Sequence, residues 1–194
     1  MNLIFSLDLS IRNSAVGYYN GGLARTTSFP TKADIIVPQR LHKIVSGIFD
    51  FIYDVTLDYE GLNDIVIFIE NYAFASNNLV RAAEVGGSVK FKICDWFSNR
   101  ASFIYIAPAT LKKFTTGNGR ANKIEMDRAV YKKWGAECPN EDECDAYALA
   151  QFGGAYCNGG DLMKREMETI KTVFRSKENI GNERFCFYEK EFNV

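Results

Sequence analysis

The pattern of apolar and polar positions predicts strands at the start of the chain. Residues 3–9 form a nearly continuous apolar run that only Asp8 interrupts, and such a run is typical of a strand covered on both faces. Residues 15–19 and 23–29 predict two more strands, and the Asn-Gly-Gly at 20–22 predicts a tight hairpin between them. We therefore expect the chain to open with a three-stranded antiparallel meander.

The next segments alternate helix with strand. Apolar residues at helical spacing predict a helix over 39–59, and the β-branched run at 65–69 predicts a buried parallel strand. Residues 77–97 predict a second long helix, and 101–107 predict a fifth strand that Pro108 stops. This order indicates an α/β fold with a mixed five-stranded sheet. Three antiparallel strands are followed by two parallel ones, and helices flank both faces.

The rest of the chain is expected to be mostly helical. The pattern predicts helices at 108–114, 123–134 and 142–157, with a glycine-containing loop at 115–122. After two consecutive glycines at 159–160 the composition changes to mixed charge, with a peripheral helix over 163–174 and a strand or irregular tail at the end. We therefore divide the chain into a domain at 1–158 and a C-terminal extension of unknown role at 159–194.

Composition narrows the possible chemistry. The net charge is −1, which argues against general coating of polyanions but allows a local basic face. Five cysteines without a Cys-x-x-Cys pair indicate free thiols in a reducing cytoplasm. The one histidine, His42, makes a zinc site of the usual kind unexpected, so a metal site must use oxygen ligands and favours Mg²⁺ or Mn²⁺. We expect neither a signal peptide nor a membrane span.

A pair of acids opens the helix predicted at 142–157. Asp142 and Asp145 are three residues apart, so they lie on one face of that helix. The same face continues through small and apolar residues and is therefore expected to point into the protein: Ala146, Leu149, Ala150 and Gly153. Two like charges directed at a core destabilise a fold unless something neutralises them, and a divalent cation commonly does so. Their neighbours Glu141 and Glu143 are expected to be solvated.

Two further acids end predicted strands. Asp8 lies near the end of the first strand and Glu70 at the end of the fourth. Ligands of α/β sheets bind at such carboxyl ends, and a helix packed over this edge would bring Asp142 and Asp145 within reach. Two Mg²⁺ ions held there could activate water and stabilise the departing 3′-oxyanion of a phosphodiester. Each acid alone is equally explained as a turn residue, an N-cap or a solvated strand end, but all four in this order favour the metal site.

Three blocks of the sequence resemble the RuvC family of Holliday junction resolvases in the RNase H-like superfamily. They comprise 7–10 with Gly17 and Tyr18, then 69–71, and then 142–150, which is similar to the family pattern Asp-x-x-Asp-Ala-x-Ala-x-Ala. The resemblance spans about 1–157. It implies an RNase H-like fold, a homodimer, and magnesium-dependent nicking of two strands of a four-way DNA junction during recombination and repair. A bacterial cytoplasm, or a cell infected by a phage or virus, is the implied setting.

The resemblance also implies DNA contacts by basic residues. Lys112 and Lys123 match basic positions of the family, and one of them is expected to stabilise charge on the scissile phosphate. With Lys113 and Arg120 they flank a Gly-x-Gly loop, and such loops suit phosphate contacts. The remaining basic residues of the following helix are expected to form an ordinary solvated face: Arg128, Lys132 and Lys133.

Two aromatic residues and one helix complete what the resemblance implies. Tyr72 and Phe74 follow Glu70, where the family carries an aromatic side chain that stacks on an unpaired base. The helix at 77–97 matches the segment that forms the dimer interface in the family.

The sequence therefore predicts a structure-selective endonuclease for branched DNA. Asp8, Glu70, Asp142 and Asp145 are expected to hold two Mg²⁺ ions, for which Mn²⁺ can substitute. Water attacks the phosphorus and leaves 5′-phosphate and 3′-hydroxyl ends. The alternatives are another RNase H-like nuclease that cuts RNA–DNA hybrids or flaps, and a non-catalytic junction-binding protein. An ATP-binding relative of the same fold is less favoured, because no glycine follows Asp8 until position 17.

Overall fold

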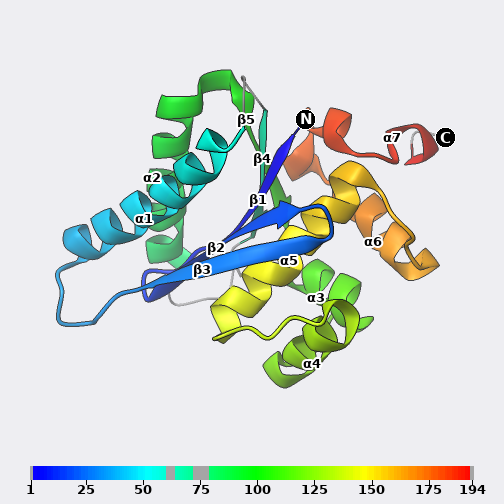
Figure 1. The fold of residues 1–194 in the computed structure, drawn as a ribbon, viewed down its shortest axis with the longest axis horizontal. Helices are drawn as coiled ribbons and strands as arrows, with labels where there is room; N and C mark the ends of the chain where they lie inside the picture. The colour runs from blue at the N-terminus through cyan, green and yellow to red at the C-terminus, as the bar shows by residue number, and fades with distance from the viewer. Residues whose placement is uncertain (1, 60–63, 72–78, 193–194) are drawn as a thin grey trace.

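A single mixed sheet organises the computed structural model, which describes residues 2–59, 64–71 and 79–192. The sheet has five strands in the order β3-β2-β1-β4-β5 (Figure 1). β1 pairs antiparallel with β2, and β2 with β3, whereas β1–β4 and β4–β5 are parallel. This confirms the predicted fold class. The strands are β1 (Leu3–Asp8), β2 (Asn13–Asn20), β3 (Leu23–Pro30), β4 (Ile65–Glu70) and β5 (Ala101–Ile106).

Helices cover both faces of the sheet. α1 and α2 pack on one face, and α5 crosses the other, with α3, α4 and α6 beyond it (Figure 1). No helix in the described part of the chain is long and apolar enough to cross a bilayer. The α-helices are α1 (Val37–Leu57), α2 (Leu79–Phe97), α3 (Pro108–Thr116), α4 (Lys123–Trp134), α5 (Glu141–Asn158), α6 (Lys164–Phe174) and α7 (Glu189–Phe192), and the 3₁₀ turns are η1 (Ser98–Arg100), η2 (Lys177–Asn179) and η3 (Glu183–Phe185).

Strand β1 divides its side chains between the two layers. Leu3, Phe5 and Leu7 join the core under α1 and α2, whereas Ile4 joins the core under α5. Successive side chains of a strand point to opposite faces. Asp8, four residues after Ile4, therefore lies on the α5 face.

Strand β4 follows the same rule. Phe68 belongs to the core on the α5 side, so Glu70, two residues later, also lies on that face. The two strands are parallel neighbours, with Leu7 opposite Ile69. Asp8 and Glu70 therefore end adjacent strands side by side, as the sequence predicts.

Close packing brings the first turn of α5 over this edge. The Ser6 hydroxyl donates a buried hydrogen bond to the Ala146 carbonyl at 2.7 Å, which ties β1 to α5. A Cβ at position 17 would lie 2.4 Å from Ser6 Oγ and 3.0 Å from the Ala146 oxygen, so only Gly17 allows this approach. The contact holds Asp142 and Asp145 above the carboxyl ends of β1 and β4.

The C-terminal segment covers the edge strand β5. Asn179 pairs with both backbone groups of Tyr105: Oδ1 accepts from its N–H at 2.8 Å and Nδ2 donates to its carbonyl at 3.0 Å. Asn182 donates to the carbonyl of Phe103 at 3.0 Å. These amides bond backbone groups of the edge strand that would otherwise be open to pairing with a strand of another chain. The expected strand or irregular tail is a series of short helical turns, which share one core with α5.

Candidate active site

Four acids from three elements meet at the carboxyl end of the sheet. Burial raises the pKa of Asp8 well above its usual range, and the charges of Glu70, Asp145 and Asp142 raise it further. Burial raises the pKa of Glu70 to about 8, with Asp145 adding to the shift. Burial raises the pKa of Asp145 to about 6, against the opposing charge of Lys112. The structure thus brings together all four acids that the sequence singles out, and their charges repel one another.

This donor set fits a hard divalent cation. Carboxylate oxygens are the ligands that Mg²⁺ and Mn²⁺ prefer, and a cation offsets both the burial and the repulsion that raise the pKa of Asp8, Glu70 and Asp145. Within the described residues, no three Asp, Glu, His or Cys side chains are already arranged to hold an ion. Binding of a cation therefore requires these side chains to rotate toward one another. A cation favours that rotation because its charge cancels the repulsion among the carboxylates.

Asp142 is not the N-cap of α5. Asn140 takes that place, and its Oδ1 accepts a hydrogen bond from the N–H of Glu143 at 3.0 Å. Asp142 Oδ2 instead accepts a hydrogen bond from Asn13 Nδ2 at 2.7 Å. Asn13, at the start of β2, was not among the residues selected from the sequence. The nearest signal is its place in the polar turn that follows Asp8.

Glu143 corrects one expectation. It is only 7% exposed rather than solvated. Its carboxylate accepts hydrogen bonds from Thr26 Oγ1 at 3.1 Å, Ser28 Oγ at 2.8 Å and Asn140 Nδ2 at 3.0 Å. The side chain therefore fastens the start of α5 to β3. Glu141 is exposed, as expected.

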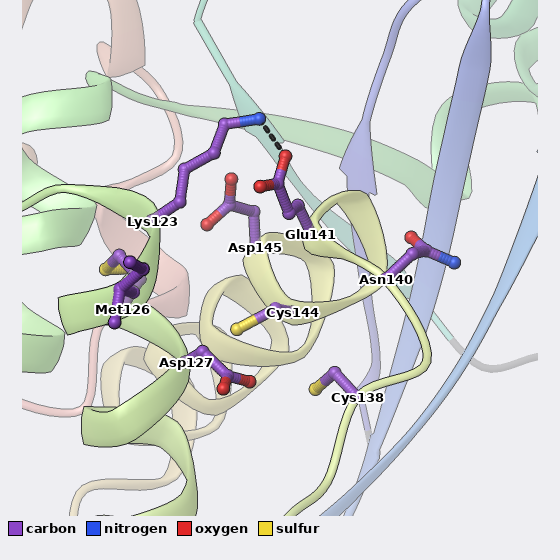
Figure 2. A pocket seen from close by; sticks show the side chains of 9 residues that line it. Lys123, Met126, Asp127, Cys138, Asn140, Glu141, Cys144 and Asp145 are labelled. Carbon is purple, nitrogen blue, oxygen red and sulfur yellow. Dashed lines mark hydrogen bonds and ion pairs between the residues drawn. The ribbon is translucent and has the colours of Figure 1, made fainter.

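The two lysines expected to act on the phosphate lie beside the acids. Lys112 on α3 lowers the pKa of Glu70 and Asp145 through its charge. Lys123, the first residue of α4, lowers the pKa of Asp8 and Asp145 in the same way. Its ammonium pairs with Glu141 at the mouth of the site (Figure 2).

The other predicted DNA contacts comprise two basic residues and two aromatic residues. Lys113 and Arg120 are exposed on α3 and on the loop after it. Tyr72 and Phe74 lie outside the described residues.

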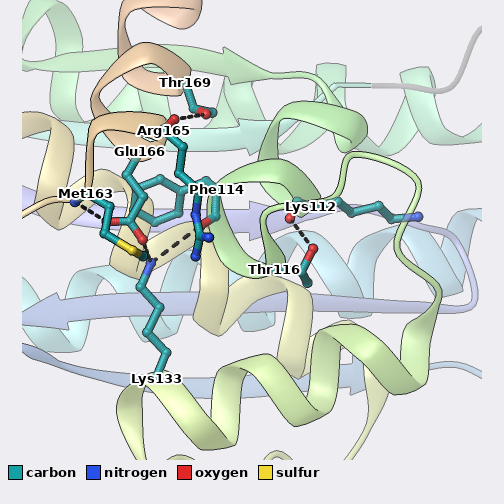
Figure 3. Close-up of polar contacts among 8 residues, drawn as sticks. All are labelled: Lys112, Phe114, Thr116, Lys133, Met163, Arg165, Glu166 and Thr169. Carbon is teal, nitrogen blue, oxygen red and sulfur yellow. Dashed lines mark hydrogen bonds and ion pairs between the residues drawn. The ribbon is translucent and has the colours of Figure 1, made fainter.

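Lys133 corrects a second expectation, because it is not part of a solvated face. Its ammonium lies 2.7 Å from a carboxylate oxygen of Glu166 on α6 (Figure 3). It also lies 4.2 Å from the ring centre of Phe114 and 4.6 Å from that of Trp134. Burial lowers the pKa of Lys133, and the ion pair opposes that shift. The residue joins α4 to α6.

A pocket of about 300 Å³ adjoins the acids between α4 and the start of α5 (Figure 2). Its wall combines charged side chains with thiols and apolar groups. The lining residues include Lys123, Met126, Cys138, Glu141, Cys144 and Asp145. Of the four acids, Asp145 therefore borders this hollow directly.

The sheet order and the acid-bearing edge define an α/β protein with an RNase H-like fold. The chain has the fold of RuvC from Thermus thermophilus: the TM-score is 0.60 at 17% identity, over 79% of this chain and 94% of that one. T. thermophilus RuvC in complex with Holliday junction substrate aligns with a TM-score of 0.59 at 16% identity, over 86% and 96%. The resemblance indicated by the sequence is thus confirmed in the fold. No family model and no curated protein matches the sequence.

Proposed function

We propose that this protein is a magnesium-dependent, structure-selective endodeoxyribonuclease that resolves Holliday junctions or related branched DNA by paired nicks. One observation carries the proposal: Asp8, Glu70, Asp142 and Asp145 gather on one edge of an RNase H-like sheet, where burial and neighbouring acidic charges raise the pKa of Asp8, Glu70 and Asp145. The solved complex of T. thermophilus RuvC with a Holliday junction supports this class of substrate.

The four carboxylates are assigned as the ligands of two Mg²⁺ ions per site, with Mn²⁺ as a substitute. Bound magnesium supplies Lewis-acid stabilisation of the phosphoryl oxygens and a lower pKa for attacking water. The chain contributes anionic oxygens held in a partly buried site, where electrostatic interactions are stronger than in bulk water. Attack by water on phosphorus then leaves a 5′-phosphate and a 3′-hydroxyl.

Lys112 and Lys123 are assigned to the scissile phosphate. Lys123 is 67% exposed and already pairs with a carboxylate, so a DNA phosphate can replace Glu141 as its partner with little movement of the backbone. Lys112 lies near enough to Glu70 and Asp145 for its charge to lower the pKa of both. Lys113 and Arg120 are assigned to neighbouring phosphates, which position DNA without reading its sequence.

We assign the exposed apolar face of α2, with the adjoining groove to α1, to a homodimer. Phe91 is 74% exposed and Val80 is 81% exposed, and a groove of about 630 Å³ between the helices is lined partly by Leu41 and Val45. Exposed apolar patches of this kind mark interaction sites. A twofold dimer presents two active sites, one for each nick. Sedimentation equilibrium tests this assignment, and a monomer at micromolar concentration contradicts it.

The function is tested by incubating the protein with Mg²⁺ and a synthetic four-way junction, beside duplex, flap and RNA–DNA hybrid substrates. We expect paired cuts in the junction. Asp142→Asn should abolish cutting and retain junction binding, whereas Asp127→Asn, an acid of the same pocket outside the four, should cut like the parent. Cutting of the hybrid alone indicates another RNase H-like nuclease. Binding of the junction without cutting by the parent indicates a non-catalytic binder.

A further inference from the structure

The side-chain amide of Asn13 uses its nitrogen in a hydrogen bond, whereas its oxygen has no partner among the described residues. Its Nδ2 donates to Asp142 Oδ2 at 2.7 Å, across 129 residues of sequence. Its Oδ1 is buried and has no hydrogen-bond partner among the residues that the structure describes. Buried polar atoms are almost always paired, because leaving water without a new partner costs free energy. The bare oxygen lies on a side chain that touches one of the four acids, so it belongs to the same site.

The turn after β1 holds Asn13 in this place. The Ser10 hydroxyl donates to the Asn13 carbonyl at 2.9 Å and accepts from the Asn13 N–H at 3.1 Å. The Ser14 hydroxyl donates to the Ser10 carbonyl at 2.7 Å. These bonds close the turn on itself, and the β1–β2 ladder begins directly after it, with Asp8 opposite Ala15. The amide therefore projects from a fixed backbone.

We propose that Asn13 is a positioning residue for the metal centre. By occupying Oδ2 of Asp142, its amide group leaves Oδ1 of that carboxylate for the cation. Its own buried oxygen accepts a hydrogen bond from a water of the hydrated cation, since Mg²⁺ retains several waters in protein sites. This inference rests on the proposed function, because it requires the four acids to bind a cation.

The chemistry selects asparagine at this position. An aspartate would set a second carboxylate against Asp142 and remove the donor. Alanine would remove both the donor and the acceptor. Groups that orient metal ligands typically change metal affinity or activity by 10- to 100-fold when they are removed. We expect Asn13→Ala to weaken Mg²⁺ binding by about tenfold.

The test measures Mg²⁺ binding to the full-length protein without DNA, by isothermal titration calorimetry. The variants are Asn13→Ala, Asp142→Asn and the double substitution, with Asn13→Ser as a second variant that keeps a polar side chain too short for both bonds. If Asn13 acts mainly through Asp142, replacing it by alanine should weaken binding less in the Asp142→Asn background than in the parent, and an equal loss in both backgrounds would contradict the inference. Arg12→Gln is the matched control, because it changes an exposed side chain of the same turn and leaves the bonds that hold Asn13 in place, and it should bind within about twofold of the parent.

The outcomes separate this inference from the proposed function. If the parent binds Mg²⁺ and Asn13→Ala and Asn13→Ser bind it equally well, Asn13 does not position the site. Equal weakening by Arg12→Gln shows that the effect is not specific to Asn13 and also overturns the inference. If the parent itself binds no Mg²⁺, the metal centre and the proposed function fail together with it. Circular dichroism of the metal-free variants should show that all melt within a few degrees of the parent.

Discussion

Glu143 and Asp145 lie two residues apart on α5, yet their surroundings differ in kind. Glu143 accepts hydrogen bonds from Thr26, Ser28 and Asn140, so its charge is satisfied by the fold itself. Asp145 lies among other acids, and burial raises its pKa to about 6. A carboxylate surrounded by hydrogen-bond donors stabilises the fold. A carboxylate surrounded by like charges needs a neutralising partner from outside the chain, such as a divalent cation.

The difference should be largest in activity. Asp145→Asn is expected to lower junction cleavage by about a thousandfold or more, since removing a metal ligand loses several kcal/mol of transition-state stabilisation. Glu143→Gln keeps the shape of the side chain and lies outside the acid cluster, so it should retain cleavage within about fivefold. Single-turnover rates at saturating Mg²⁺ measure both. Equal losses in the two variants would remove the distinction between these acids.

For the free energy of unfolding, the order of the two acids should be reversed, with the larger loss at Glu143. Glu143→Ala removes the acceptor shared by three partly buried donors and is expected to lower the free energy of unfolding by about 2 kcal/mol. Asp145→Asn removes a charge from a repelling cluster and should leave the metal-free protein as stable as the parent or more stable. Urea unfolding followed by circular dichroism gives both values. A large loss in Asp145→Asn would show that its carboxylate supports the fold.

The acid cluster should make the metal-free protein less stable as pH rises. The folded-state pKa of Glu70 is about 8 and that of Asp145 about 6, both above the values of about 4 in an unfolded chain. Between these limits the folded protein binds more protons than the unfolded one, so each group lowers stability by about 1.4 kcal/mol per pH unit. The loss begins near pH 4 to 5 and ends near pH 8.

Urea unfolding at pH 5, 6, 7 and 8 measures this slope. Glu70→Gln should reduce the slope most above pH 7, where Asp145 has largely titrated. Saturating Mg²⁺ should oppose the loss, because it binds the ionised carboxylates of the folded state. A metal-free protein that gains stability between pH 6 and 8 would contradict the repulsion inferred for these acids.

The smallest effect is expected for the lysine at the mouth of the site. Lys123→Ala should weaken junction binding by a few fold. It should also reduce the slope of the logarithm of the binding constant against the logarithm of salt concentration by about 1, the value for one phosphate contact. Lys132 on the same helix is exposed and serves as the matched control. Binding measured between 50 and 200 mM salt distinguishes them. The same slope for both variants would place Lys123 outside the DNA interface.

Periodic features of the sequence predicted most of the fold. Continuous apolar runs predicted β1 and β4 and put Asp8 and Glu70 at their ends, and the small residues of α5 indicated the face that carries Asp142 and Asp145. Pairings between polar side chains leave no such periodic trace. Ser28 and Glu143 are 115 residues apart.

The same limit applies elsewhere in the molecule. Asn13 and Asp142 meet only because α5 packs onto β1 and β2. The ion pair of Lys133 with Glu166, and the cover that Asn179 provides for β5, likewise depend on tertiary packing. The four acids could be predicted because they end regular elements, and the residues that support them could not.

A crystal structure of the protein soaked in Mn²⁺, with anomalous diffraction to locate the ions, tests the central claim most directly. The account predicts manganese at the carboxyl ends of β1 and β4, coordinated by Asp8, Glu70, Asp142 and Asp145. Manganese bound elsewhere on the chain, with these four carboxylates unliganded at pH 8, would contradict it.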